Sequence, residues 1–397
     1  MRAGPGSGYR ARVRWNIERR LVLVVGAVVF VDTMFYAAIA PLLPTLAHQL
    51  HLSKLSAGVM TGGYPAGTLL GSLPGGILAV RAGPKRTLYA GLALLAGSTL
   101  AFGFLQNAVL LDTARFVEGV GGACSWAGGL AWIVSETPAG RRGGVIGSAL
   151  GAAVAGALFG PVVGTIADAV GRGAAFSGVV VIALVLIDQA RRLPLVHTPS
   201  GQGLRALGGA LRDARVLAGM WLVTLGAVSS GAVNVLGPLR LHRLGAAAVV
   251  IGAIYVAGAA FEGSISPFAG RFSDRRGRMG PLAVGLAVPI PLLLCFTFPD
   301  SVVLLGLLIV GIDGALGGLW TPAMAMLSDA AEGRALDQGL AAALINLAWA
   351  GGQIIGSSGG GGLAKASGDR LPMTVTAALF AATLVWLLRA RRLIAAL

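Results

Sequence analysis

The sequence predicts an all-α membrane protein with twelve transmembrane helices in two six-helix halves, and three observations support this fold class. The chain is 55% hydrophobic and only 12% charged, whereas soluble domains carry about 25% charged residues. Apolar runs long enough to cross a hydrocarbon core about 30 Å thick recur along the whole chain. Glycine accounts for 62 of the 397 residues, which in a membrane favours close helix packing through small residues.

The first apolar run, residues 19–44, carries one acid, Asp32, near its middle. A carboxylate at that depth is costly, so it is retained mainly where it faces a cavity and carries out a task such as proton transfer. The alternative is a buried acid that a neighbouring hydroxyl, lysine or arginine satisfies. We favour the functional interpretation.

The remaining apolar runs complete a set of twelve spans whose lengths suit tilted helices. Their expected ranges are 19–46, 54–80, 84–105, 108–134, 143–169, 173–190, 216–240, 246–271, 279–299, 301–328, 337–364 and 371–390. The chain therefore divides into a basic N-terminus (1–18), an N-terminal half (19–190), a linker (191–215) and a C-terminal half (216–397). The first run is too long for a signal peptide and lacks a cleavage site, so we expect the span to be retained.

Lysine and arginine gather in every second connection, the side on which both termini lie. The positive-inside rule places those connections and both termini in the cytoplasm of a multi-pass plasma (inner) membrane protein. The net charge of +15 is thereby explained without a nucleic-acid partner. Cys124 and Cys295 lie inside apolar runs without metal-binding spacing, and we expect no metal and no cofactor.

The linker is the longest polar stretch of the chain. Its second half has the pattern of an amphipathic helix, with Leu204, Leu207 and Leu211 on one side and arginines elsewhere. Such a helix would lie at the cytoplasmic lipid surface.

Glycine patterns repeat between the two halves. Gly76 and Gly83 recur as Gly270 and Gly277, and a second set, spaced four apart, recurs in the eleventh span (Gly156, Gly160, Gly164; Gly352, Gly356, Gly360). Two such halves are typical of a transporter that rocks about a binding site at the membrane midplane.

Four stretches carry a family resemblance: GRFSDRRGR (270–278) with its counterpart GILAVRAGPKR (76–86), GALFGPVVG (156–164), DTARFVEGVGGA (112–123) and VDTMFYAAIAPLLPTL (31–46). The chain resembles the major facilitator superfamily, and within it the twelve-span drug/proton antiporters, including the vesicular amine transporter branch. The resemblance implies that the two loops gate the cytoplasmic side and stabilise the outward-open state. The residues concerned are Gly76, Gly83, Arg86, Gly270, Asp274, Arg275, Gly277 and Arg278.

Val80 stands where the family usually has an acid, so we expect the C-terminal copy of the loop to dominate the gate. A basic turn that only orients the protein is the alternative. The fifth span resembles the antiporter signature and favours export. Its glycines form a flat face for helix contact, and Pro161 removes a hydrogen bond and allows a kink.

Asp112, Arg115 and Glu118 are spaced three apart and share one helix face. We expect Arg115 and Glu118 to pair, either as a structural ion pair or so that Arg115 modulates the proton affinity of a nearby carboxylate. Asp32 and Tyr36 are four apart and together offer a charge and an aromatic wall to a cation.

Glu262 and Asp313 are isolated acids in apolar runs and are alternative proton carriers. Further substrate-binding candidates, for which helix packing is the alternative role, are Trp126, Asn234, Trp320, Asn346 and Gln353. Amine specificity does not transfer directly, because Gly237 and Asn346 stand where the amine transporters carry acids.

These features predict a monomeric secondary transporter that exports small lipophilic or cationic compounds in exchange for protons. The alternative within transport is a proton-coupled importer or facilitator of a sugar, amino acid or other metabolite. An enzyme is disfavoured because the spans contain no nucleophile–base pair or paired metal ligands, and a channel because no filter-like segment repeats. A non-transporting sensor built on this fold stays open.

Overall fold

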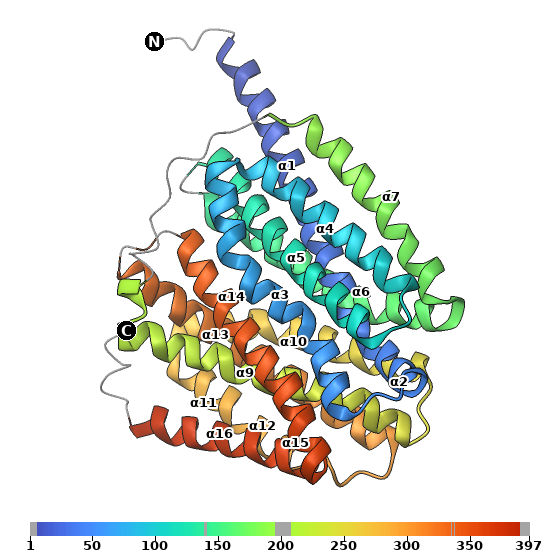
Figure 1. The fold of residues 1–397 in the computed structure, drawn as a ribbon. Coiled ribbons are helices and arrows are strands. Elements are labelled where there is room, and N and C mark those ends of the chain that lie inside the picture. Colours follow the sequence, from blue (N-terminus) through green and yellow to red (C-terminus); the bar gives the residue numbers. More distant parts are fainter. Residues whose placement is uncertain (1–5, 139–140, 195–207, 335, 337, 390–397) are drawn as a thin grey trace.

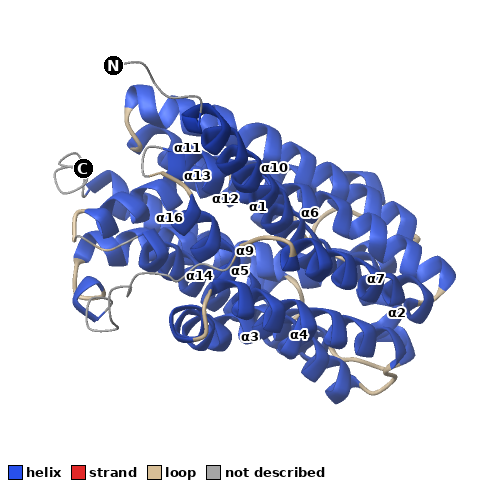
Figure 2. Ribbon diagram, turned by 90° about the horizontal axis from the view of Figure 1, so that it is seen from above, coloured by secondary structure: helices blue, strands red, loops and turns tan. Residues whose placement is uncertain are grey.

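The computed structural model describes residues 6–138, 141–194, 208–334, 336 and 338–389. Over these residues it consists of helices and short connections (Figure 2). The start of α1 and the end of α16 lie on the same side of the helix bundle (Figure 1). We call that side the terminal face. The far face is the opposite side, which holds the connections at 50–53, 105–107, 171, 244–247, 296–301 and 368–369.

The N-terminal half contains seven helices that correspond to six spans. They are α1 (Gly6–Ala37), α2 (Ile39–Gln49), α3 (Lys54–Arg81), α4 (Pro84–Phe104), α5 (Ala108–Glu136), α6 (Arg142–Val170) and α7 (Arg172–Arg191). The predicted ranges agree with these bounds to within a few residues, except that the first helix begins earlier, at Gly6, and that its span is divided at Ala38.

The C-terminal half repeats this order, with two further spans divided. Its elements are α9 (Ala214–Arg243), α10 (Ala248–Arg276), α11 (Met279–Ala287), α12 (Pro289–Cys295), α13 (Val302–Glu332), α14 (Gln338–Ile354), the π-helical segment η2 (Ile355–Gly359), α15 (Gly360–Ser367) and α16 (Arg370–Arg389). The amphipathic linker helix was predicted over the second half of residues 191–215. Residues 195–207 lie outside the described residues, whereas residues 208–210 are helical and are followed by a turn at Leu211 and Arg212.

Within the described part of the chain, nine helices are long and apolar enough to cross a membrane. The stretch Met279–Cys295 is apolar but shorter. Helices α3 and α5 are 28 and 29 residues long, and their glycines and charged side chains lower their apolarity. With these three the bundle is consistent with the twelve predicted spans.

The first span is interrupted where Ala38 separates α1 from α2. Proline lacks an N–H group and its ring clashes with the carbonyl four residues earlier, so Pro41 accounts for the break after Ala37. In the fifth span, where Pro161 was predicted to allow a kink, α6 continues through Pro161 as one helix, and the kink itself stays a prediction. The clear interruption near the candidate site therefore lies in the first span.

The two halves use the same glycine-dependent backbone features. Gly83 (φ +92°) and Gly277 (φ +85°) begin equivalent helices in conformations that favour glycine. A methyl group on Gly156 would collide with Thr33 and the Phe30 carbonyl of α1. In the C-terminal half, Gly356 lies equally close to the backbone of α9. Each half therefore packs its fifth helix closely against its first.

Each half has its own hydrophobic core, and the halves meet toward the far face. Figure 1 shows α2 beside the C-terminal half, where it packs against α9 and α10. Gly58 of α3 lies against the backbone of Ser357 in η2, and Gly252 of α10 lies against Thr165 of α6. A π-helical turn often marks a functional site within a helix, and here it forms part of the contact between the halves.

Ion pairs differ between the two faces. On the far face Lys54 of the N-terminal half lies 2.6 Å from Asp369 of the C-terminal half, and Arg243 pairs with the same carboxylate. On the terminal face no ion pair found among the described residues joins the helices α1–α7 to the helices α9–α16; the pairs there are Glu18–Arg141, Asp188–Arg192, Arg278–Asp329 and Asp213–Arg334.

Candidate functional site

Asp32 is completely buried within the N-terminal half. Its Oδ2 accepts hydrogen bonds from the Tyr64 hydroxyl at 2.8 Å and from the Trp126 indole nitrogen at 2.9 Å. Its Oδ1 has no hydrogen-bond partner among the described residues. A methyl group on Gly122 would lie 2.7 Å from this Oδ1, so the absence of a side chain there leaves room beside the acid. One oxygen is held in place, and the other is available to a proton.

Arg115 and Glu118 of α5 form an ion pair at 2.9 Å, and each residue is only 2% exposed. The guanidinium also donates to the carbonyls of Phe35 at 3.4 Å and Tyr36 at 3.1 Å. Arg115 therefore donates to two backbone carbonyls next to the break in the first span, and the Phe35 carbonyl also accepts from the Ala38 N–H at 3.3 Å. The predicted pair is present, but Asp112 does not join it, and its Oδ1 lacks a partner in the described part of the chain.

Aromatic side chains surround this ion pair and extend to the other half. The rings of Tyr36 and Tyr64 lie 4.6 Å apart, and the Arg115 guanidinium lies 5.8 Å and 5.5 Å from them. Tyr36 also makes an edge contact at 5.6 Å with Trp349 of α14. The aromatic wall predicted at Tyr36 therefore includes residues of both halves.

The C-terminal half contributes two half-buried acids, Glu262 of α10 and Asp313 of α13. Asp313 lies against Gly258, and Glu262 lies against Gly317, so the two carboxylates share the seam between the helices. Among the described residues neither side chain has a hydrogen-bond partner. Helix α10, which carries Glu262, also packs against α2 and α6 of the N-terminal half.

Some of the other predicted substrate-binding residues make side-chain contacts in the structure and others make no side-chain hydrogen bond. Gln353 is 2% exposed and donates to Ser230 at 2.7 Å, a contact between helices of one half. The ring of Trp320 lies 3.4 Å from where a methyl group on Gly226 would be. Asn234 and Asn346 are half-buried and make no side-chain hydrogen bond within the described region. Of the predicted set, Trp126 is the residue that bonds directly to Asp32.

The predicted gating loops lie on the terminal face, where Lys85 of the first loop donates to the backbone carbonyls of Arg191 at 3.1 Å and Leu193 at 2.6 Å. Asp274, Arg275 and Arg86 are exposed. Arg278 pairs with Asp329 at the end of α13, within its own half. The assignment of these residues to a gate stays a prediction, because the structure is closed at the opposite face.

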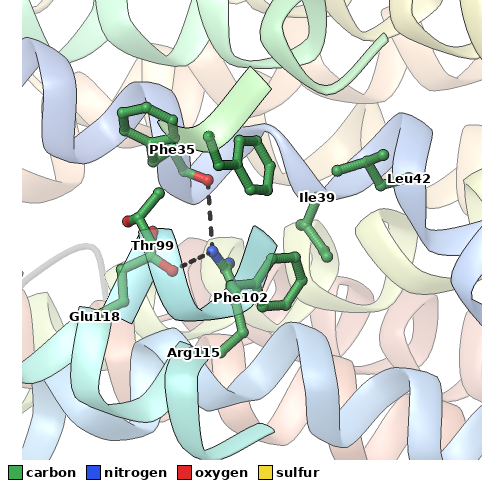
Figure 3. Close-up of a pocket in the computed structure, with 8 residues that line it drawn as sticks. Phe35, Ile39, Leu42, Thr99, Phe102, Arg115 and Glu118 are labelled. Carbon is green, nitrogen blue, oxygen red and sulfur yellow. Dashed lines mark hydrogen bonds and ion pairs between the residues drawn. The ribbon is translucent and has the colours of Figure 1, made fainter. Parts of the chain in front are cut away.

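A small cavity adjoins the Arg115–Glu118 pair. Figure 3 shows Arg115 between the Phe35 carbonyl and the Glu118 carboxylate at its edge. Its volume is about 10 Å³ for a water-sized sphere, which is far too small for a transported compound. The lining residues are Phe35, Ile39, Leu42, Thr99, Phe102, Arg115, Glu118 and Phe176.

Sequence reasoning missed Tyr64 and the far-face cluster of Lys54, Arg243 and Asp369. Tyr64 lies in an apolar run with no local charge pattern, and the cluster joins residues far apart in the chain. The only available signal was that Tyr64 is a phenol within a span. Over the described residues, no three His, Cys, Asp or Glu side chains lie together as a possible metal site.

Comparison with known proteins decides the family. The family model of the Major Facilitator Superfamily matches residues 25–335. The chain belongs to the Major Facilitator Superfamily. As predicted, it is therefore a multi-pass membrane protein of a transporter family and not of a family of enzymes.

Among curated relatives, the synaptic vesicular amine transporter of Homo sapiens is 28% identical over 315 residues, which cover 76% of this chain and 60% of that protein. The chain thus matches less than two thirds of that relative's length. The 4-hydroxybenzoate transporter PcaK of Pseudomonas putida is 30% identical over 111 residues, or 28% of this chain and 24% of that protein.

A solved structure shows the same fold. It is the crystal structure of a bacterial homologue of the human lysosomal transporter Spinster, in an inward-facing and unoccupied conformation. The TM-score is 0.74 at 15% identity, and the match covers 96% of this chain and 97% of that one. The predicted major facilitator fold is confirmed.

Proposed function

We propose that this transporter exports small lipophilic or cationic compounds in exchange for protons, with Asp32 as the proton-carrying group. The observation that carries the proposal is the burial of Asp32, with Oδ2 held by two donors and Oδ1 unpartnered. An ionisable group kept within a membrane span at such cost is by default part of an ion or proton route.

The orientation follows from charge. Lysine and arginine are concentrated on the terminal face, so this face is cytoplasmic in a plasma (inner) membrane. The structure is then inward-facing, because the contacts between the halves lie toward the far face. A monomer suffices for this cycle, since one chain supplies both halves of the site.

The cycle depends on the cost of charge in the membrane. In the inward-facing state an ionised Asp32 adds negative charge to a region that already holds Glu262 and Asp313, and a cation is attracted from the cytoplasm. The aromatic rings of Tyr36 and Trp349 can contact this cation through cation–π interactions. A proton from the far side neutralises Asp32, weakens the attraction and releases the substrate. The neutral acid then allows the empty transporter to return to the inward-facing state, where Asp32 releases its proton to the cytoplasm and is ionised again.

The similarity to an amine transporter supports a cationic cargo. The second candidate is a proton-coupled importer or facilitator of a metabolite, which the shorter match to a 4-hydroxybenzoate transporter favours. The two differ in the direction in which protons move relative to substrate.

Proton coupling is tested in proteoliposomes with an imposed pH gradient and a pH-sensitive dye in the lumen, using a panel of cationic dyes, amines and aromatic acids. We expect a cation to release protons from an acidic lumen in the wild type and not in Asp32→Asn. Asp168→Asn is the matched control. The Asp168 carboxylate accepts a hydrogen bond of 2.7 Å from the Thr45 hydroxyl and is not part of the candidate site. Coupled export at the wild-type rate by a folded Asp32→Asn protein would contradict the proposal. Substrate uptake together with protons would favour the importer.

A further inference from the structure

The small cavity beside the Arg115–Glu118 pair is lined by polar atoms that the protein leaves unpartnered. Glu118 Oε1, Arg115 Nε and Thr99 Oγ1 are buried and have no hydrogen-bond partner among the described residues. All three residues are 2% exposed, and all three line the same cavity (Figure 3). Three orphaned polar groups at one point are unusual, because the large majority of buried polar atoms in proteins are hydrogen-bonded.

The size of the cavity matches a single water molecule. It offers about 10 Å³ to a water-sized sphere, which is close to the smallest volume that holds one water. A buried water also needs two to four polar partners. The cavity supplies an acceptor in the Glu118 carboxylate, a donor in the Arg115 Nε–H and a hydroxyl in Thr99 that acts as either.

The ion pair itself needs such a partner. A buried ion pair is stable only when further hydrogen bonds satisfy the remaining lone pairs and protons. Arg115 uses its two terminal nitrogens for Glu118 and for the Phe35 and Tyr36 carbonyls, and Glu118 uses only Oε2. Glu118 Oε1 has no protein donor among the described residues, and apart from Thr99 and Arg115 the other lining residues present apolar side chains.

We propose that this cavity binds one water molecule, which donates to Glu118 Oε1, accepts from Arg115 Nε–H and bonds to the Thr99 hydroxyl. The water links α4 to the ion pair that holds the break in the first span. It lies inside the N-terminal half, in a cavity that no transported compound enters, so its binding does not depend on the direction of transport.

Hydroxyl-radical labelling by X-ray radiolysis tests the site on the purified full-length protein, because a bound water generates radicals beside buried side chains. Phe35 and Phe102, buried at the cavity, should be labelled several-fold more than Phe380, a fully buried phenylalanine of the other half. Thr99→Val removes only the hydroxyl and should lose most of that labelling, whereas Thr99→Ser should keep it. Thr87→Val on the same helix, whose hydroxyl bonds to the Gly83 carbonyl, is the matched control.

Equal labelling of Phe102 and Phe380 would show that the cavity is dry and would overturn the proposal. Labelling that Thr99→Val leaves unchanged would overturn the assignment of its hydroxyl. The melting temperature of Thr99→Val gives an independent test, because the direction of its change differs between a hydroxyl bonded to water and an unpartnered one. A hydroxyl bonded to water makes Thr99→Val neutral or destabilising, whereas a truly unpartnered hydroxyl makes the same change stabilising, and a raised melting temperature would contradict the bound water.

Discussion

The two halves share a backbone plan and differ in how they hold their membrane-buried acids. Gly83 and Gly277 repeat the same turn, and Gly156 and Gly356 repeat the same close helix contact. Asp32 in the N-terminal half is nevertheless fully buried and bonded to two donors. Glu262 and Asp313 in the C-terminal half are only half-buried, and no donor is found for them among the described residues.

This difference indicates that the repeat determines packing, while the chemistry of each half is set by single residues. A fully enclosed acid with fixed donors suits a proton, which needs no space. Half-buried acids that lie near the contact between the halves suit a cation that arrives from solution. We therefore expect proton coupling to depend on the N-terminal half and cation affinity to depend on the C-terminal half.

The largest expected effect comes from neutralising the acids of each half separately. Asp32→Asn should reduce substrate-driven proton movement to the level of protein-free vesicles. Glu262→Gln or Asp313→Asn should retain coupling and raise KM for a cation about tenfold, because a hydrogen bond to a charged group contributes about 1.5 kcal/mol or more. Transport kinetics in proteoliposomes measure both. Coupling lost equally in all three variants would remove the distinction.

The next effect concerns the ion pairs of the two halves. Arg115→Leu leaves Glu118 charged and buried, and should lower the free energy of unfolding by about 3–5 kcal/mol. Arg278→Gln breaks a pair whose Asp329 side chain is 50% exposed, and should cost about 1 kcal/mol or less. Equilibrium unfolding in detergent measures the free energy of unfolding of both variants. The double variant Arg115→Leu/Glu118→Leu should recover much of the loss, and failure to recover would show that Arg115 acts mainly through the Phe35 and Tyr36 carbonyls.

The smallest expected effect concerns the close helix contact that both halves make, at Gly156 in one and Gly356 in the other. Gly156→Ala and Gly356→Ala should each destabilise by about 1–3 kcal/mol, because the added methyl group meets backbone of the neighbouring helix. Gly151→Ala and Gly351→Ala are controls with open space at the added methyl, and should change stability by about 1 kcal/mol at most. Thermal melting of the four variants ranks them. Unequal costs at Gly156 and Gly356 would show that the repeated contact is not equivalent.

The fold was predictable because most of the spans can be recognised by their length and apolarity. The Arg115–Glu118 pair was predictable as well, because residues three apart on a helix must lie side by side. The bonds of Asp32 to Tyr64 and Trp126 were not, since they join three helices and depend on how these pack. The break at Ala38 was missed for another reason: Pro41 and Pro161 look alike in sequence, and the surroundings decide which one interrupts a helix.

The ion pairs of Lys54 and Arg243 with Asp369 on the far face hold the two halves together, and their strength depends little on pH. Burial raises the pKa of Asp369, but hydrogen bonds and charge from Lys54 and Arg243 lower it more, so this pKa lies below its ordinary value. A lowered pKa means that the stabilisation is present above the ordinary value of about 3.9 and is lost only as the pH falls through the lowered pKa. Mild acidification therefore leaves this cluster ionised. Ionic strength, which screens the partly exposed lysine and arginine, is the solution variable that loosens it.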